Sequence, residues 1–156
     1  MKNKKGFTLI ELLIVISIIA ILGAIVIVAI NPAEMFGRSN NAQRYSNVNT
    51  ILSAINQYTI DAVGKLPVNI SSTSTEICFT GAADCTGLVD LSEITQNEKY
   101  ILKMPIDPSC SGVAPTVSPP CDPNGIGYFV QETPNERIIV SAPYTELSVT
   151  EIKVSR

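Results

Sequence analysis

Few side chains in this sequence are suited to chemistry, and cysteine is the most reactive type among them. The four cysteines, Cys78, Cys85, Cys110 and Cys121, stand at C-x6-C and C-x10-C spacings, and the chain has no histidine. Zinc sites need closer cysteine pairs, and the absence of histidine removes Ser-His-Asp and Cys-His catalysis. The chain also lacks a glycine-rich phosphate loop and an evident carboxylate pair, so we expect no enzyme activity, no metal and no cofactor.

Disulfide formation is therefore the chemistry that the cysteines favour, provided that their domain is exported. An even number of cysteines in an exported domain is typical of a disulfide framework. Three connectivities are possible, and we favour Cys78–Cys85 with Cys110–Cys121 because both bonds close short loops, worth about 2–3 kcal/mol each. Four free buried thiols are the alternative if the compartment is not oxidising.

A single carboxylate, Glu11, is the other unusual group, because it is the one charge within the 24 residues 7–30. A helix of that length spans about 36 Å, enough to cross a hydrocarbon core of about 30 Å. Lys2, Lys4 and Lys5 precede it. Positive charge stays on the cytoplasmic side, so the remainder of the chain lies outside.

Two ordinary interpretations of this stretch leave features unexplained. A secretory signal peptide has a shorter apolar core and a cleavage site of small residues, whereas residues 31–35 read NPAEM. A plain membrane anchor explains the length and the lysines but not Glu11, since a charge at membrane depth costs about 2.5–3.5 kcal/mol.

Residues 4–15, KKGFTLIELLIV, closely resemble the class III signal of type IV prepilins and pseudopilins. The resemblance implies that a prepilin peptidase cuts between Gly6 and Phe7 and methylates the new amine of Phe7. It also implies that the apolar helix is retained as the core of a filament. We assign Thr8 and Glu11 to assembly, with the Phe7 amine of a neighbouring subunit as the favoured partner of Glu11.

This interpretation divides the chain into a leader peptide (1–6), a transmembrane and filament-core helix (7–30) and an exported globular pilin domain (31–156). The net charge of the whole chain is −3. Cleavage would remove three of the 11 basic residues and leave eight against 14 acidic ones, a net charge of −6. Such a balance argues against a broad basic surface for nucleic acid.

The helix is expected to continue past residue 30. Proline interrupts or kinks a helix, so Asn31-Pro32 predicts a continuous but bent helix, weakest over residues 34–41. An amphipathic pattern follows and ends at Gly64 and Pro67. Its apolar stripe comprises Tyr45, Val48, Ile51, Leu52, Ile55, Tyr58, Thr59 and Ala62.

The C-terminal third predicts an antiparallel sheet. Residues 127–131 and 137–141 flank a turn and indicate a hairpin, and residues 149–154 alternate as a third strand. Residues 88–91 indicate a short strand or turn, and residues 68–76 a polar, weakly structured segment. Within that segment Asn69 and the cluster Ser71–Thr75 are possible glycosylation sites, although an unmodified loop is favoured. The fold class is α+β, the pilin fold: a long N-terminal helix, half apolar and half amphipathic, packed against a small C-terminal sheet.

The function implied by the resemblance is that of a structural subunit of a type IV pilus or pilin-like filament, serving adhesion, motility or DNA uptake. Its expected partners are copies of itself in a helical filament, the prepilin peptidase, a membrane assembly platform and inner-membrane lipid. The protein would lie in the cell membrane before assembly and in an extracellular or periplasm-spanning filament afterwards. The alternatives are a pseudopilin of a type II secretion system and a single-pass membrane-anchored binding module.

Overall fold

The structure is a computed structural model that describes residues 6–29, 31–67, 70–110 and 121–156. The chain forms two compact units, Met1–Phe36 and Gly37–Arg156, which are described separately. The three leader lysines and the possible glycosylation site Asn69 lie outside the described residues.

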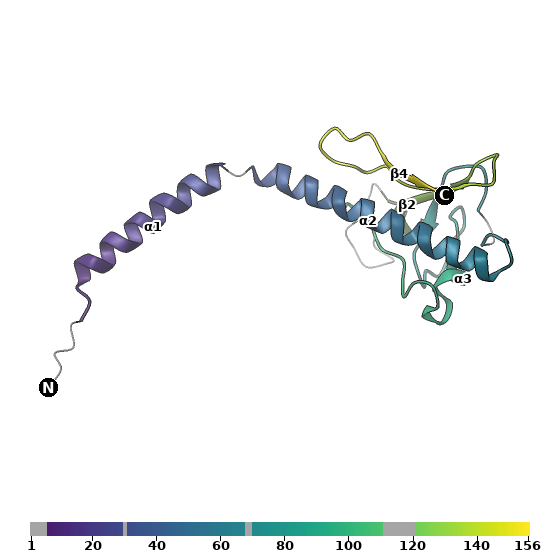
Figure 1. Ribbon diagram of the computed structural model, residues 1–156, viewed down its shortest axis with the longest axis horizontal. Helices are drawn as coiled ribbons and strands as arrows, with labels where there is room; N and C mark the ends of the chain where they lie inside the picture. Colours follow the sequence, from purple (N-terminus) through teal and green to yellow (C-terminus); the bar gives the residue numbers. More distant parts are fainter. Residues whose placement is uncertain (1–5, 30, 68–69, 111–120) are drawn as a thin grey trace. The chain divides into compact units, whose positions relative to one another are not determined.

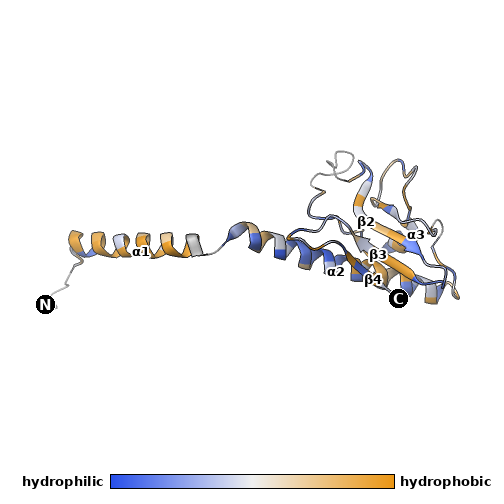
Figure 2. Cartoon of the chain, turned by 90° about the horizontal axis from the view of Figure 1, so that it is seen from above, coloured by the Kyte–Doolittle hydropathy of each residue, from blue (hydrophilic) through white to orange (hydrophobic). Residues whose placement is uncertain are grey.

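The first unit contains helix α1, Leu9–Ala29. Its colouring in Figure 2 is apolar along almost the whole length. Large apolar side chains from Leu9 to Ile27 are all at least 46% exposed, so nothing within the unit covers them. By length and composition the 19 residues Leu9–Ile27 suffice to cross a membrane. An apolar helix that the chain leaves bare suggests membrane anchoring.

Helix α2, Pro32–Asp61, is a separate helix, so the expectation of one continuous bent helix is wrong. Asn31 is not helical, and its side-chain Oδ1 accepts the backbone N–H of Glu34 at 3.4 Å. The first backbone bond of α2 runs from Met35 N to Asn31 O, 3.1 Å. Asn31 is thus the N-cap and Pro32 the first helical residue, where a missing N–H costs nothing. The same dipeptide that was expected to bend a helix instead starts a new one.

The buried face of α2 agrees only in part with the apolar stripe expected from the sequence. Val48, Ile51 and Ile55 are fully buried as predicted, whereas Tyr45 is 59% exposed and Arg44 is fully buried. Residues 34–41, expected to be the weakest part of the helix, are helical throughout. At the other end Gly64 takes a φ of 85° and its N–H bonds to Thr59 O at 2.8 Å, which closes the helix.

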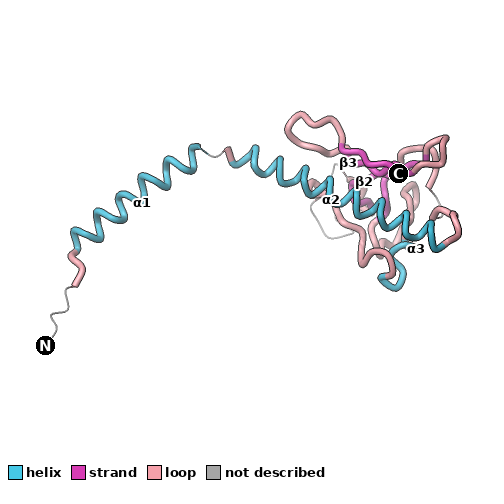
Figure 3. Tube along the Cα trace, viewed as in Figure 1, coloured by secondary structure: helices cyan, strands magenta, loops and turns pink. Residues whose placement is uncertain are grey.

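Four antiparallel strands form one sheet in the order β1-β2-β3-β4. Figure 3 draws the strands in magenta. They are β1 (Thr75–Cys78), β2 (Gly125–Glu132), β3 (Ile138–Ala142) and β4 (Ile152–Ser155). The hairpin of β2 and β3 is confirmed, with Val130 opposite Val140. The third expected strand starts three residues late, and β1 was missed.

The second unit has one main core between the sheet and the distal part of α2, which lies beside the strands in Figure 1. The short helix α3 (Ser92–Thr95) adds Ile94 to this core, and the 3-10 helix η1 (Gln96–Glu98) follows it without a buried residue. Tyr128 of β2 is fully buried, and its hydroxyl accepts the side-chain amide of Asn47 at 2.8 Å. Burial raises the pKa of Tyr128 to about 12. The α+β class expected from the sequence is confirmed.

Candidate processing and assembly site

The predicted processing and assembly residues lie together at the start of α1. Because the helix begins at Leu9, Thr8 occupies the N-cap and Glu11 the third helical position. Glu11 Oε2 accepts both the backbone N–H and the hydroxyl of Thr8 at 2.9 Å, and Thr8 Oγ1 accepts the backbone N–H of Glu11 at 3.3 Å. This reciprocal arrangement is a capping box, in which each side chain satisfies an N–H that the helix leaves free.

The capping box fixes the direction in which the Glu11 carboxylate points. Two bonds to Thr8 turn the carboxylate toward the N-terminal side of the helix. Within the described residues, Oε1 of Glu11 makes no hydrogen bond, so one oxygen is available to another donor. The capping role gives a physical reason for a threonine at position 8. The sequence pattern T-x-x-E is the signature of this cap.

The peptide bond between Gly6 and Phe7 is open to approach. The Phe7 side chain is 87% exposed, and an added Cβ at Gly6 would meet nothing within 4 Å. An exposed segment without secondary structure, immediately before a helix, is accessible to a peptidase.

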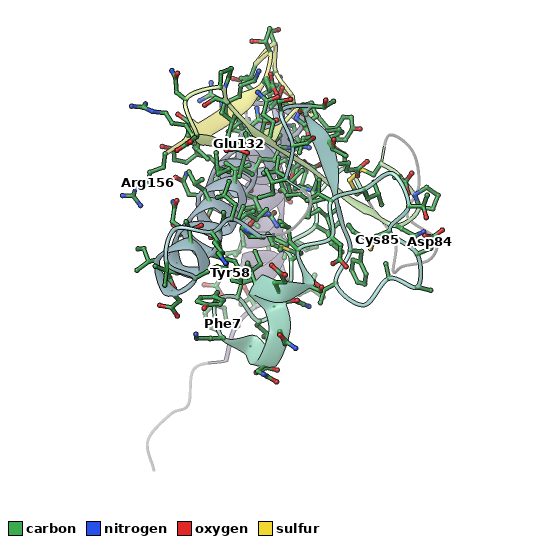
Figure 4. All side chains as sticks on the ribbon, turned by 90° about the vertical axis from the view of Figure 1, so that its right-hand side faces the viewer. Phe7, Tyr58, Asp84, Cys85, Glu132 and Arg156 are labelled. Carbon is green, nitrogen blue, oxygen red and sulfur yellow. A yellow bond between two sulfur atoms is a disulfide. The ribbon has the colours of Figure 1, made fainter. Side chains whose placement is uncertain are left out.

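The four cysteines form two disulfides, Cys78–Cys85 and Cys110–Cys121, each with 5.7 Å between its Cα atoms. In Figure 4 Cys85 and the neighbouring Asp84 lie at the periphery of the unit. The second disulfide is buried against Gly127 of β2, where φ is 78° and a Cβ would collide with the Cys110 sulfur. Glycine is therefore required at position 127 for two reasons: the positive φ angle, and the close approach of the Cys110 sulfur to the backbone.

A buried ionic cluster joins α2 to two loops, and sequence reasoning missed it. Arg44 Nε and Nη2 donate to the two carboxylate oxygens of Asp107 at 2.8 and 3.1 Å. Nη2 also donates to Ser109 Oγ at 2.6 Å, and Nη1 lies 3.3 Å from Glu146 Oε1. The side chains of Arg44 and Asp107 are both fully buried. Spacing could have indicated that Arg44 is buried, because it precedes Val48, Ile51 and Ile55 by intervals that place all four residues on one helix face.

The loop Pro143–Glu151 is fixed to the N-terminal half of α2 by Glu146. The amide of Asn40 donates to Glu146 Oε1, and that of Asn41 to the Glu146 carbonyl, both at 2.8 Å. Leu147 lies on Gly37, where an added Cβ would be 2.8 Å from its Cγ. These contacts hold the loop against residues 37–41, and the last strand begins after the loop, at Ile152.

Glu76 of β1 is a second buried acid that the sequence did not reveal. Its Oε1 accepts the N–H of Gly127 at 2.7 Å, and its Oε2 that of Asp122 at 3.2 Å. Burial raises the pKa of the Glu76 carboxyl, although the two N–H donors oppose the shift. A Cβ at Gly125 would collide with this carboxylate, so Gly125 makes room for it.

Comparisons with known proteins agree with this geometry. Residues 1–29 match the family model of the prokaryotic N-terminal methylation motif. The motif, the bare apolar helix and the sheet beside α2 define a protein with the N-terminus and the α+β architecture of type IV pilins, which confirms the resemblance to the pilin and pseudopilin family.

The chain is also similar to a named pilin. It is 36% identical over 87 residues to the type IV wide pilus major component PilA4 of Thermus thermophilus. The alignment covers 51% of this chain and 65% of that protein, so the chain spans less than two thirds of its relative. No solved structure matches the chain.

Proposed function

We propose that this protein is a structural subunit of a type IV pilus or pilin-like filament, processed by a prepilin peptidase and assembled through α1. The processed protein is held in the inner membrane by α1 before assembly, and an assembly platform transfers it into a filament that leaves the membrane. Similarity to a pilus component and the methylation motif support this assignment.

One observation carries the proposal. At the start of the exposed apolar helix α1, the Glu11 carboxylate is oriented by hydrogen bonds to only one of its two oxygens. Thr8 holds Glu11 Oε2, while Oε1 has no hydrogen bond among the described residues. An apolar helix needs a surrounding of lipid or of other apolar helices. A carboxylate in either surrounding needs a cation, because an unpaired buried charge is strongly destabilising.

Cleavage after Gly6 would supply that cation. The amide nitrogen of Phe7 then becomes an amine, which methylation leaves positively charged. Phe7 stands four positions before Glu11, about one helical turn away. Pairing with the amine of a neighbouring copy would set the axial register between two otherwise featureless apolar helices.

Intact-mass spectrometry of the protein from its own cells tests the processing step. We expect loss of residues 1–6 and one added methyl group on Phe7. As a control, Gly6→Leu should leave the precursor uncut. A wild-type chain that keeps its leader, or that begins at another residue, would contradict the proposal.

A further inference from the structure

The sheet of the second unit has one edge to which no described residue is paired. On the outer side of β1, the N–H of Val89 donates to the Glu76 carbonyl and its carbonyl accepts the N–H of Cys78, both at 2.9 Å. At the other edge β4 pairs with β3 on one side, and nothing among the described residues pairs with its other side. An unpaired strand edge is a template for another strand.

The hydrogen bonds between β3 and β4 determine which backbone groups point outward. Arg156 and Ile138 exchange both of their main-chain bonds at 3.1 Å. Because bonded residues alternate along an antiparallel strand, every second residue back from Arg156 also faces β3. The residues between them, Glu151, Lys153 and Ser155, therefore point their N–H and C=O groups away from the sheet. Within the described residues these outward groups make no hydrogen bond.

The side chains of Glu151 and Lys153 place opposite charges next to each other at this edge. They project from the same face of the strand, because they are two residues apart. Lys153 Nζ lies 2.7 Å from Glu151 Oε2, and the two side chains are 56% and 29% exposed, respectively. A lysine at a sheet edge ordinarily discourages pairing with another strand. Here the adjacent glutamate gives the edge a charge pattern that is complementary to its own reversed copy.

One antiparallel register of two β4 edges satisfies both the hydrogen bonds and the charges. With Ile152 opposite Ile152 of a second copy, Glu151 of each chain is opposite Lys153 of the other, and the outward backbone groups face one another. The two neighbouring registers that keep these groups opposed place Glu151 opposite Glu151, or Lys153 opposite Lys153. Like charges directly opposite are destabilising, so the charges select the first register.

We propose that β4 pairs antiparallel with β4 of a second copy of this chain, about a two-fold axis at Ile152, and joins the two sheets into one. In each of the two Glu151–Lys153 pairs the chains would exchange both main-chain bonds, and the opposite charges would lie side by side. Such a contact uses the same surface of both copies, whereas a filament repeats through two different surfaces. The proposal is therefore separate from assembly through α1 and does not rest on it.

Charge reversal tests the proposed register. Sedimentation velocity of the full chain in a density-matched detergent, at high micromolar concentration, measures self-association, and any contact through α1 is common to all variants. Glu151→Lys and Lys153→Glu each place like charges opposite one another and should each weaken self-association about tenfold. An equal mixture of the two variants should associate like wild type, because each lysine then faces a glutamate. The matched control Lys99→Glu reverses another exposed lysine, which pairs with Asp61 away from this edge, and should have no effect.

Disulfide trapping tests the position of the two-fold axis. Ile152 would be opposite its own copy in a pair without hydrogen bonds, where Cα atoms are about 4.5 Å apart, which is within the range of a disulfide. Ile152→Cys should therefore form a disulfide-linked dimer under mild oxidation, since the four native cysteines are already paired with each other. As a control, Ser155→Cys should form none, because two copies of that residue would be about 20 Å apart.

Three results would overturn the proposal. The first is equal trapping of Ile152→Cys and Ser155→Cys, or no dimer from either. The second is self-association of both charge-reversal variants at the wild-type level. The third is a mixture of these variants that associates no better than each alone, because the charges would then not lie opposite one another. Thermal unfolding of each variant checks that the fold is intact.

Discussion

The long helices α1 and α2 differ in how their charged side chains are satisfied. In α2 the charge of Arg44 is fully buried and is satisfied inside the chain by Asp107 and Glu146. In α1 the charge of Glu11 is exposed and is held on one oxygen by its own helix cap. The apolar face of α2 is covered by the sheet, whereas the apolar surface of α1 is bare. Within the described residues, the second unit therefore satisfies the buried charge and covers the apolar face of α2, whereas the apolar side chains of α1 have no cover.

The contrast between the buried charge in α2 and the exposed charge in α1 predicts that a substitution of Arg44 has the largest effect on stability. Arg44→Ala leaves Asp107 buried without its partner, which should cost about 3–5 kcal/mol of unfolding free energy. Urea unfolding of the full chain in detergent, followed by far-UV circular dichroism, measures the loss. Lys99→Ala is the matched control, because Lys99 and Asp61 form an exposed pair at 2.7 Å and exposed pairs contribute little. Equal effects of both variants would show that α2 does not depend on the buried cluster.

The disulfides should come next. Converting Cys78 and Cys85 together to serine should cost about 2–3 kcal/mol, since the bond closes a short loop. The loss should be confined to the second unit and should leave α1 in the membrane. Peptide mapping of exported protein without reductant should recover the linked pairs Cys78–Cys85 and Cys110–Cys121. Alkylation of all four thiols before reduction would contradict both bonds.

A smaller, pH-dependent effect is expected at Glu76. Its carboxyl has a raised pKa in the folded protein, so the stability linked to its protonation is present below the unfolded pKa of about 4.3 and is lost as pH rises through the folded value. The stability difference between wild type and Glu76→Gln should therefore shift in favour of wild type as pH falls from 7 toward that value. A difference that is constant with pH would show that burial does not dominate at this site.

The sequence predicted most of what periodicity can reveal. The length of the apolar stretch, the core positions Val48, Ile51 and Ile55 and the β2–β3 hairpin follow from local pattern. Strand β1 was not predicted because Thr75 and Glu76 are residue types common in loops. Their strand conformation depends on pairing with Phe129 and Val130, more than fifty residues away.

The buried polar groups were harder for the same reason. Arg44 and Glu76 are buried because partners distant in sequence satisfy them, and no local pattern announces such partners. Asn31-Pro32 was misjudged in another way, since proline at a first helical position is as favourable as proline inside a helix is costly. The cap between Thr8 and Glu11 follows the local pattern T-x-x-E and could have been predicted from it.

Glu11→Ala tests the central claim most directly, that Glu11 serves assembly rather than the fold of one chain. Electron microscopy of fibres from cells whose only copy carries the substitution gives the readout, with Glu132→Ala as a control that removes one negative charge from the end of β2. We expect Glu11→Ala to be processed, to stay in the membrane and to unfold like wild type, but to form no fibres, while the control assembles. Fibres of normal number and length made of Glu11→Ala alone would contradict the account.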